Sequence, residues 1–289
     1  MRRSLLHFRA CWSACLPFCS FSKRSRLAWL VVALPLATQG ADWQPLFNGC
    51  DLEGWDAILI KHHQADDSAE NYFKVENGAI HVYAGKENGS AQPFAALVSK
   101  QSFSHYHLSL EYRWGVAKFQ PRVELLRDAG LLYHVHGQGR PAWPLSVESQ
   151  IQEGETGDTY TIGTQVSAWL DPGSHTPAAN GQVAHYSYLP HAVEQRWIAT
   201  GVAGKILRIR HNQPSEVSGW NRLEIIVEGD RAIHRVNGIT VMQIADFRRW
   251  DDSTQQWAPL TSGKLLLQAE GAEVFYRNIR IRSLPTSGQ

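Results

Sequence analysis

The stretch "WNRLEIIVEGDRAIHRVNGITVMQI" (residues 220–244) decides the fold class of this chain. Apolar and polar residues alternate along it, and the dipeptides Gly229-Asp230 and Asn237-Gly238 interrupt the alternation. Alternation with a period of two is typical of a strand that buries one face, and Asn-Gly is typical of a two-residue hairpin turn. The stretch therefore predicts three consecutive antiparallel strands.

The same pattern continues on both sides of this stretch. Alternating segments lie at 73–83, 105–115, 129–137, 147–152 and 263–284, while helical periodicity is scarce. Many short strands with glycine turns and no long amphipathic helix are typical of an all-β protein. We therefore expect one domain, built as a β-sandwich or jelly roll.

The segment 167–219 departs from this regularity, because it is rich in proline, glycine, serine and asparagine. A connection of this length is usually a set of functional loops, or it contains short strands of its own. We expect it to overhang a cleft. Trp169 and Tyr186 could supply apolar surface there, or they could simply anchor the segment.

Residues 1–40 have the pattern of a secretory signal that is removed after export. Residues 1–26 contain basic residues and no acidic one, and the apolar run "LAWLVVALPLA" follows at 27–37. Thr38 and Gly40 are the small residues before the expected cleavage site. A membrane anchor needs about 20 apolar residues, and this run is much shorter. We expect a periplasmic or secreted domain comprising 41–289, with no membrane attachment after cleavage.

Composition narrows the class of protein further. After cleavage only Cys50 remains, so the domain has no internal disulfide and depends on its own core. The formal net charge is +1 and no basic run follows the signal, which argues against nucleic acid as a partner. Tryptophan and tyrosine are abundant after residue 42. They suit stacking on carbohydrate, or a large β core.

Seven segments of the chain, taken in order and at their spacing, carry a resemblance to a known family. They are "LFNGCDLEGW" (46–55), "FKVENGAI" (73–80), "LSLEYRWG" (108–115), "DAGLLYH" (128–134), "VESQIQEGETGDTY" (147–160), "GWNRLEIIVEGDRAIHRVNG" (219–238) and "LLLQAEGAEVFYRNIRI" (265–281). Together they resemble the 3-keto-disaccharide hydrolase domain family. The resemblance implies a concanavalin A-like jelly-roll β-sandwich, as in lectins and glucanases. It also implies an enzyme whose carbohydrate substrate is first oxidised by a sugar 3-dehydrogenase.

The chemistry of a 3-keto-glycoside defines what such a site must contain. A ketone at C3 makes the C2 proton acidic, because its removal gives an enolate. The C1–O bond can then break by elimination, and water adds afterwards. The reaction needs a base near C2, a donor for the departing oxygen, and donors or positive charge at the enolate.

The strand predicted at 147–152 is the main source of candidate site residues, because Glu148, Gln150 and Gln152 share one of its faces. Glu148 is the expected catalytic carboxylate, and Gln150 is an expected donor to a sugar hydroxyl or the enolate. His134 is a second catalytic candidate, since an imidazole titrates near neutral pH.

Other candidates come from neighbouring segments. Glu111 could supply a catalytic carboxylate and Arg113 a guanidinium for substrate binding, or the two could form a charge ladder that stiffens the sheet. Trp143, in a proline-containing loop before Glu148, is expected to stack on a sugar ring. Gln268, in the closing segment of the resemblance, is a further substrate-binding candidate.

Two histidines leave a metal site open as an alternative. His134 and His136 are two residues apart and so share a strand face, where they could bind a divalent metal with Glu148 or Asp128. Without a metal, His136 and Asp128 would instead contact the substrate through hydrogen bonds. Glu148, Gln150, His134 and Arg113 are expected to meet in one groove sized for a sugar ring.

Two other functions fit the same residues. The run at 148–153 resembles the Glu-x-Asp-x-x-Glu motif of family-16 glycoside hydrolases, with Gln150 in place of the aspartate. Glu153 would then be a second catalytic carboxylate, but a β-bulge would have to bring it to the face of Glu148. The other alternative is a lectin-like module that binds sugar through Trp143 and has no turnover.

Overall fold

The stretch 220–244 forms three adjacent strands, as its alternation predicts. The computed structural model describes residues 42–60, 68–137, 143–179, 183–198 and 206–286. In it, β14 (Asn221–Glu228), β15 (Ala232–Val236) and β16 (Ile239–Asp251) pair antiparallel in sequence order. Asn237 and Gly238 have positive φ angles of 51° and 83°, as expected for the two-residue hairpin turn that Asn-Gly favours.

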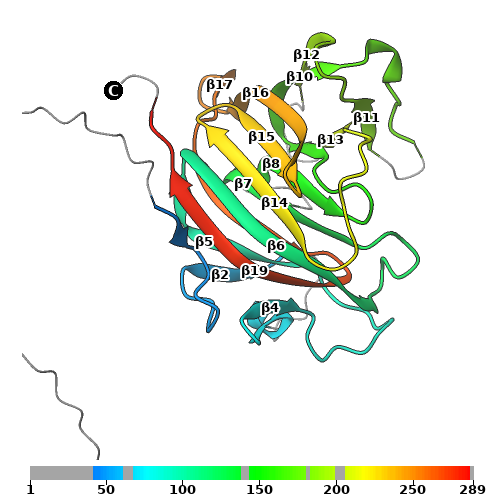
Figure 1. Cartoon of the computed structure of the whole chain (residues 1–289). Coiled ribbons are helices and arrows are strands. Elements are labelled where there is room, and N and C mark those ends of the chain that lie inside the picture. Colours follow the sequence, from blue (N-terminus) through cyan, green and yellow to red (C-terminus); the bar gives the residue numbers. More distant parts are fainter. Residues whose placement is uncertain (1–41, 61–67, 138–142, 180–182, 199–205, 287–289) are drawn as a thin grey trace, which may run out of the picture. The chain divides into compact units, whose positions relative to one another are not determined.

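These strands belong to a large sheet, sheet A, which faces the viewer in Figure 1. Its eleven strands are antiparallel. Their order is β12 (Val193–Ile198), β10 (Thr164–Leu170), β16, β15, β14, β6 (His105–Lys118), β19 (Ala272–Ser283), β4 (Ala79–Val82) and β3 (Phe73–Glu76), with β1 (Gln44–Pro45) beside β19 and β17 (Gln256–Pro259) beside β16.

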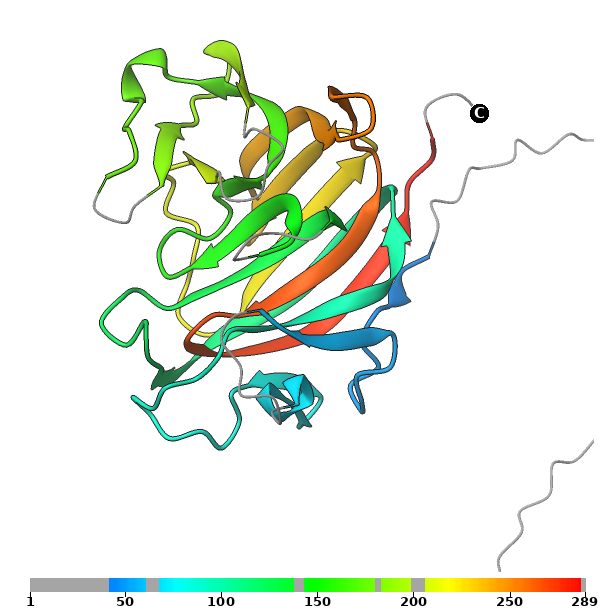
Figure 2. The same ribbon diagram turned by 180° about the vertical axis from the view of Figure 1, so that it is seen from behind.

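The second sheet, sheet B, lies behind sheet A and is seen from its own side in Figure 2. Its eight strands lie in the order β11 (Ala184–Ser187), β13 (Ile206–Arg210), β9 (Thr159–Ile162), β8 (Leu145–Gln152), β7 (Asp128–Gly137), β18 (Gly263–Ala269), β5 (Ala95–Phe103) and β2 (Trp55–Leu59). Two short 3-10 helices, η1 (Ala69–Tyr72) and η2 (Pro172–Ser174), connect strands.

The core lies between the two sheets. Leu110 and Tyr112 of sheet A and Val147, Ile151 and Leu267 of sheet B are all fully buried in one apolar cluster. Their polar sequence neighbours point to the outer faces, because successive side chains of a strand alternate. The fold is a concanavalin A-like jelly-roll β-sandwich, which confirms the expected class.

The segment 167–219 contains short strands rather than loops alone. β11 and β13 extend sheet B, and β12 extends sheet A next to β10. Trp169 lies on β10, half-buried, and the ring of Tyr186 on β11 lies 4.6 Å from the ring of His175. The expectation that the whole segment overhangs one cleft is therefore wrong, because its strands are divided between the two sheets.

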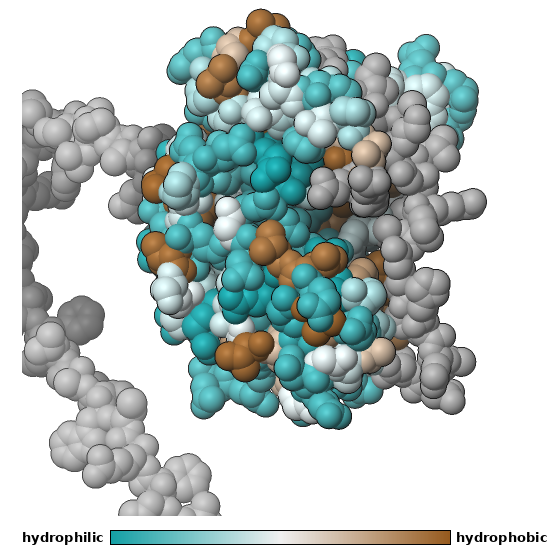
Figure 3. Space-filling model, turned by 90° about the vertical axis from the view of Figure 1, so that its right-hand side faces the viewer, coloured by the Kyte–Doolittle hydropathy of each residue, from teal (hydrophilic) through white to brown (hydrophobic). Residues whose placement is uncertain are grey.

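The remaining sequence predictions concern the free cysteine, the N-terminal signal and membrane attachment. On the side drawn in Figure 3, hydrophobic residues lie in small groups among hydrophilic ones. Cys50 is exposed and unpaired. The expected signal, residues 1–40, lies outside the described residues. In the part of the chain that the structure describes, no helix has both the length and the apolar character needed to cross a membrane.

Candidate active site

The outer face of sheet B carries a row of polar side chains on β8. Val147 and Ile151 point into the core, so Glu148, Gln150 and Gln152 point outward. The β7 residues directly opposite these three are Leu132, Gly130 and Asp128. The expectation that the three β8 side chains share a face is confirmed, and pairing with β7 adds Asp128 to that face.

Gly130 makes room for two of these side chains to approach each other. A Cβ atom built at position 130 would lie 2.1 Å from Glu148 Oε1 and 2.3 Å from Gln268 Oε1. The side chains of Glu148 on β8 and Gln268 on β18 therefore meet over β7, in space that any other residue at position 130 would occupy.

Both side chains lack the hydrogen bonds that buried polar groups normally make. Gln268 is fully buried, and neither its amide nitrogen nor its amide oxygen has a hydrogen-bond partner among the described residues. Glu148 is only 5% exposed, and its carboxyl group makes no hydrogen bond to any described residue. Buried unpaired polar groups are costly and infrequent, so their clustering is typical of a site that receives a ligand.

The surroundings of Glu148 favour its protonated form. Burial raises the pKa of its carboxyl group well above the ordinary value, and the charges of Glu270 and Asp128 raise this pKa further. Arg208 and Arg122 act in the opposite direction but do not overcome the burial. A carboxyl group of this kind exchanges protons at higher pH than one on the surface.

Asp128, in contrast, is held by several donors. Its Oδ1 accepts a hydrogen bond from Gln150 Nε2 at 3.1 Å, and its Oδ2 accepts one from Gln152 Nε2 at 3.0 Å and another from Arg122. Burial raises the pKa of Asp128 to about 6, although Arg122 and Arg208 lower it. Asp128 thus ties β7 to β8 and places a titratable charge near Glu148.

A second edge of the site comes from β9 and β13. Tyr160 lies directly opposite Glu148 on β9, and the guanidinium of Arg208 lies 5.3 Å from the centre of its ring. Arg208 Nη2 is 2.6 Å from Glu155 Oε2 and 2.5 Å from Asp158 Oδ2. Burial raises the pKa of Tyr160, so its hydroxyl stays protonated and can donate a hydrogen bond.

Sequence reasoning missed these residues. Asp158 accepts hydrogen bonds from Arg208 and from the backbone N–H of His211. The available signal was the glycine-containing turn after residue 152, because a hairpin there places Tyr160 beside Glu148. Arg208 had no such local signal, since β13 pairs with β9 from a distant part of the chain.

Trp143 lies on the same outer face, beside the row of Glu148. It is only 7% exposed and belongs to an apolar cluster that includes Leu132, the direct β7 partner of Glu148. Its ring stacks on Phe94, with centroids 6.1 Å apart and planes 9° from parallel. The expected position near Glu148 is right, but the indole is buried against Phe94 rather than open at the mouth of a cleft.

The two histidines of β7 do not join Glu148, contrary to expectation. His134 has a positive φ of 51°, at a register shift between Tyr133 and Gly137. This irregularity interrupts the alternation, so its ring is fully buried beside Phe247, a core residue, and its Nε2 donates to the Gly229 carbonyl at 2.7 Å. Burial lowers the pKa of His134 to about 4.

His136 is likewise engaged elsewhere, because its Nδ1 donates to the His134 carbonyl at 2.8 Å. The expected ligand set of His134, His136 and Glu148 or Asp128 is therefore not assembled. Among the described residues, no group of three or more histidine, cysteine, aspartate and glutamate side chains is arranged to hold a metal ion.

Glu111 and Arg113 lie on β6 in sheet A, on the outer face opposite to that of sheet B. Glu111 Oε2 accepts from Arg277 Nε at 2.8 Å and from Asn278 Nδ2 at 3.0 Å. Arg113 stacks on Phe275, 4.3 Å from the ring centre. The prediction that these two residues share a groove with Glu148 is therefore wrong. Glu111 instead takes part in a charge ladder on sheet A, which was the alternative.

Glu153 is also separate from Glu148. The β7–β8 register is unbroken from Asp128–Gln152 to Tyr133–Val147, so no bulge brings Glu153 to the outer face. Its carboxylate pairs with Arg127, with Oε1 2.6 Å from Nη2. The pair of facing carboxylates that a family-16 hydrolase requires is therefore not formed by Glu148 and Glu153.

The family of the chain is decided by a match over almost all of its described residues. The model of the 3-keto-alpha-glucoside-1,2-lyase-like domain matches residues 42–282. The chain belongs to this family. The matched range contains every strand that carries the candidate site of this 3-keto-alpha-glucoside-1,2-lyase-like domain. No curated protein matches the sequence.

Solved structures resemble the domain only distantly. A candidate glycosyl hydrolase from Parabacteroides distasonis is 18% identical, with 84% of this chain and 94% of that chain covered and a TM-score of 0.44. A laminarinase from Flavobacterium sp. is 13% identical, with coverage of 85% and 100% and a TM-score of 0.40. A carbohydrate-binding module from Bacillus subtilis is 11% identical, with coverage of 80% and 96% and a TM-score of 0.41. Similarity at this level does not indicate an activity or a ligand.

Proposed function

We propose that this protein is an exported enzyme that cleaves 3-keto-glycosides, including 3-keto-disaccharides, by proton abstraction at C2, elimination of the C1–O bond and hydration. The family description names a 3-keto-alpha-glucoside and a 1,2-lyase, which is the same substrate class and the same pair of carbon atoms. The basic and apolar pattern of residues 1–40 supports export to the periplasm or the exterior. A sugar 3-dehydrogenase would supply the oxidised substrate.

The observation that carries the proposal is the order of three side chains across sheet B. Glu148 lies in the middle, Tyr160 lies opposite it on β9, and Gln268 approaches it from β18 over Gly130. In a 3-keto sugar, C2 likewise lies between C1, which carries the departing oxygen, and the C3 carbonyl. A base at Glu148 therefore has one potential donor for each oxygen.

The proposed steps use only these groups and water. Glu148, in its ionised form, takes the C2 proton, and the Gln268 amide N–H donates a hydrogen bond to the C3 oxygen as the enolate forms. When the C3 carbonyl is restored, the C1=C2 bond forms and the C1–O bond breaks, while Tyr160 gives its proton to the departing oxygen. Water then adds its oxygen to C1 and a proton to Tyr160. Glu148 exchanges its proton with solvent and then protonates C2.

The buried surroundings of Glu148 suit this role. A carboxylate whose pKa is raised by burial is a stronger base than one on the surface. Asp128, fixed by Gln150, Gln152 and Arg122, contributes by keeping the pKa of Glu148 high.

A paired activity measurement tests the proposal. The purified mature chain is given 4-nitrophenyl α-glucoside and its 3-keto derivative, each in H2O and in D2O. We expect cleavage of the keto compound far faster than of its parent, with deuterium at C2 of the sugar product. Equal rates on both compounds, no cleavage of either, or a product without deuterium would contradict the proposal. An ordinary glycosidase would put no more deuterium at C2 than the 3-keto sugar takes up in D2O without enzyme.

A further inference from the structure

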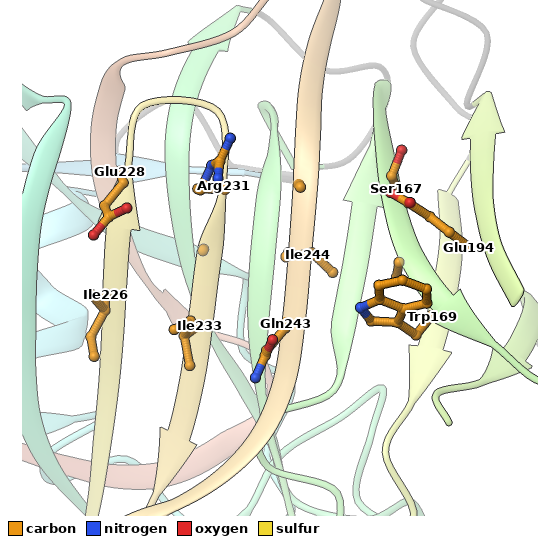
Figure 4. Close-up of a pocket in the computed structure, with 12 residues that line it drawn as sticks. Ser167, Trp169, Glu194, Ile226, Glu228, Arg231, Ile233, Gln243 and Ile244 are labelled. Carbon is orange, nitrogen blue, oxygen red and sulfur yellow. The ribbon is translucent and has the colours of Figure 1, made fainter. Parts of the chain in front are cut away.

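A hollow of about 270 Å³ lies on the outer face of sheet A, on the opposite side of the sandwich from Glu148. Strands β10, β12, β14, β15 and β16 contribute to its lining. Figure 4 shows Ile226, Ile233 and Gln243 in a row on one side of it and Trp169 on the other. This volume is just below the usual range for ligand pockets, which begins at about 300 Å³, and so suits one small ring.

The register of the strands explains why the surface is hollow here. Ile226, Ile233 and Gln243 are direct cross-strand partners on β14, β15 and β16. The next pair of residues toward β10 is Ala245 and Ser167. Because these two side chains are small, space remains between Gln243 and the half-buried indole of Trp169.

The rim of the hollow is polar and carries more negative than positive charge. Glu194, Glu228 and Arg231 are exposed and line it, together with the exposed amide of Gln243. In Figure 4, Glu228 lies above Ile226 and Arg231 above Ile233, and Glu194 lies above Trp169. Two carboxylates against one guanidinium disfavour an anionic ligand, whereas carboxylate and amide oxygens accept hydrogen bonds from neutral hydroxyl groups.

We propose that this hollow is a second carbohydrate-binding site, which holds one neutral pyranose ring of a glycan against the indole of Trp169. An apolar and aromatic surface bordered by a few polar groups is the composition expected for a sugar, whose ring faces are apolar and whose edge carries hydroxyl groups. The chain belongs to a family of glucoside-acting domains, which makes a glycan the ligand that this surface would meet. Because the site is on the other sheet, it binds independently of Glu148.

Binding of three glucose trisaccharides tests this site. Maltotriose, cellotriose and laminaritriose are titrated into the full mature chain carrying Glu148→Gln, and binding is followed by tryptophan fluorescence and saturation-transfer NMR. We expect at least one of them to bind, and Trp169→Ala to weaken that binding at least about tenfold. Trp257→Ala, which removes a half-buried tryptophan of β17 outside the hollow, is the matched control and should bind as the parent does.

Three results would overturn the second site. These are no binding of any of the three sugars, unchanged binding in Trp169→Ala, and an equal loss in the control. Should Trp169→Ala melt at a much lower temperature than its parent, Gln243→Ala decides instead, because this exposed side chain can be removed without loss of core packing. With Glu148 intact, Trp169→Ala should cleave the 3-keto-glucoside at the parent rate, so failure of this site and failure of the proposed reaction are distinguishable.

Discussion

Gln268 on β18 meets Glu148 on β8 across an intervening strand, because the β7 residue between them is Gly130. The two side chains are almost completely buried, and in the part of the chain that the structure describes Gln268 has no hydrogen-bond partner for either amide atom. This contact between strands that are not neighbours is the feature on which the proposed chemistry most depends.

Gly130→Ala tests that contact directly. The added Cβ would lie within 2.3 Å of both Glu148 Oε1 and Gln268 Oε1, so one or both side chains must move. We expect kcat/KM on the 3-keto-glucoside to fall at least about tenfold, with a loss of about 1–3 kcal/mol in the free energy of unfolding. Gly137→Ala, on the same strand but next to Leu145 rather than Glu148, is the control and should retain activity. Equal activity of the two variants would contradict the assignment.

Glu148→Gln should remove activity and raise stability at neutral pH. Loss of the base should lower kcat at least about 100-fold. Because the folded-state pKa of Glu148 is raised, the folded chain binds more protons than the unfolded chain, and stability falls as pH rises from about 4.5 toward that pKa. The variant lacks this loss. Urea unfolding at pH 5 and at pH 8 should therefore show that the free energy of unfolding decreases less with pH in Glu148→Gln than in the parent. A larger decrease in the variant would contradict the burial of the carboxyl group.

Glu153→Gln separates the two enzymatic interpretations. Glu153 pairs with Arg127 away from the site, and hydrogen bonds from Arg127 lower its pKa. Its ionised form therefore contributes stability that is present above the unfolded-state pKa and lost as pH falls. We expect the variant to keep its rate on the 3-keto-glucoside within about twofold, because a surface ion pair contributes little. A loss as large as that of Glu148→Gln would instead favour a two-carboxylate mechanism.

Asp128→Asn should shift the pH dependence of the reaction. The charge of Asp128 raises the pKa of Glu148, and Arg122, now without its carboxylate partner, would lower that pKa further. The pH at which Glu148 becomes ionised should therefore move down, and with it the acidic limb of the dependence of kcat/KM on pH, where activity rises as the base ionises. An unchanged profile would show that Asp128 and Glu148 are not electrostatically coupled.

His134→Gln should affect stability rather than catalysis. The folded-state pKa of about 4 lies below the ordinary value of 6.5, so the unfolded chain binds a proton first and stability falls as pH decreases from about 6.5 to 4. The variant should lose this part of the pH dependence and keep kcat/KM within a few-fold. Loss of activity with normal thermal unfolding would contradict this prediction and would indicate that His134 acts in the site.

The candidate site was only partly predictable, and the residues themselves show why. Glu148 and Gln150 were found because alternation along one strand places them on the same face. Glu111 is on an equally clear outer face, but of the other sheet, and no local pattern tells the two sheets apart. The prediction for His134 was wrong for a different reason. This residue has a positive φ, and the irregularity that it creates in β7 reverses the alternation of side chains after it.

The sequence by itself determined the strands, their turns and the face that each side chain takes, because these depend on the two-residue period and on turn residues close together in the chain. Tertiary structure alone decided which faces meet. The approach of Gln268 to Glu148, the placement of Arg208 over the ring of Tyr160, and the hollow beside Trp169 all depend on pairing between strands distant in sequence. Such pairing is selected by burial of the whole core, and no short segment specifies it.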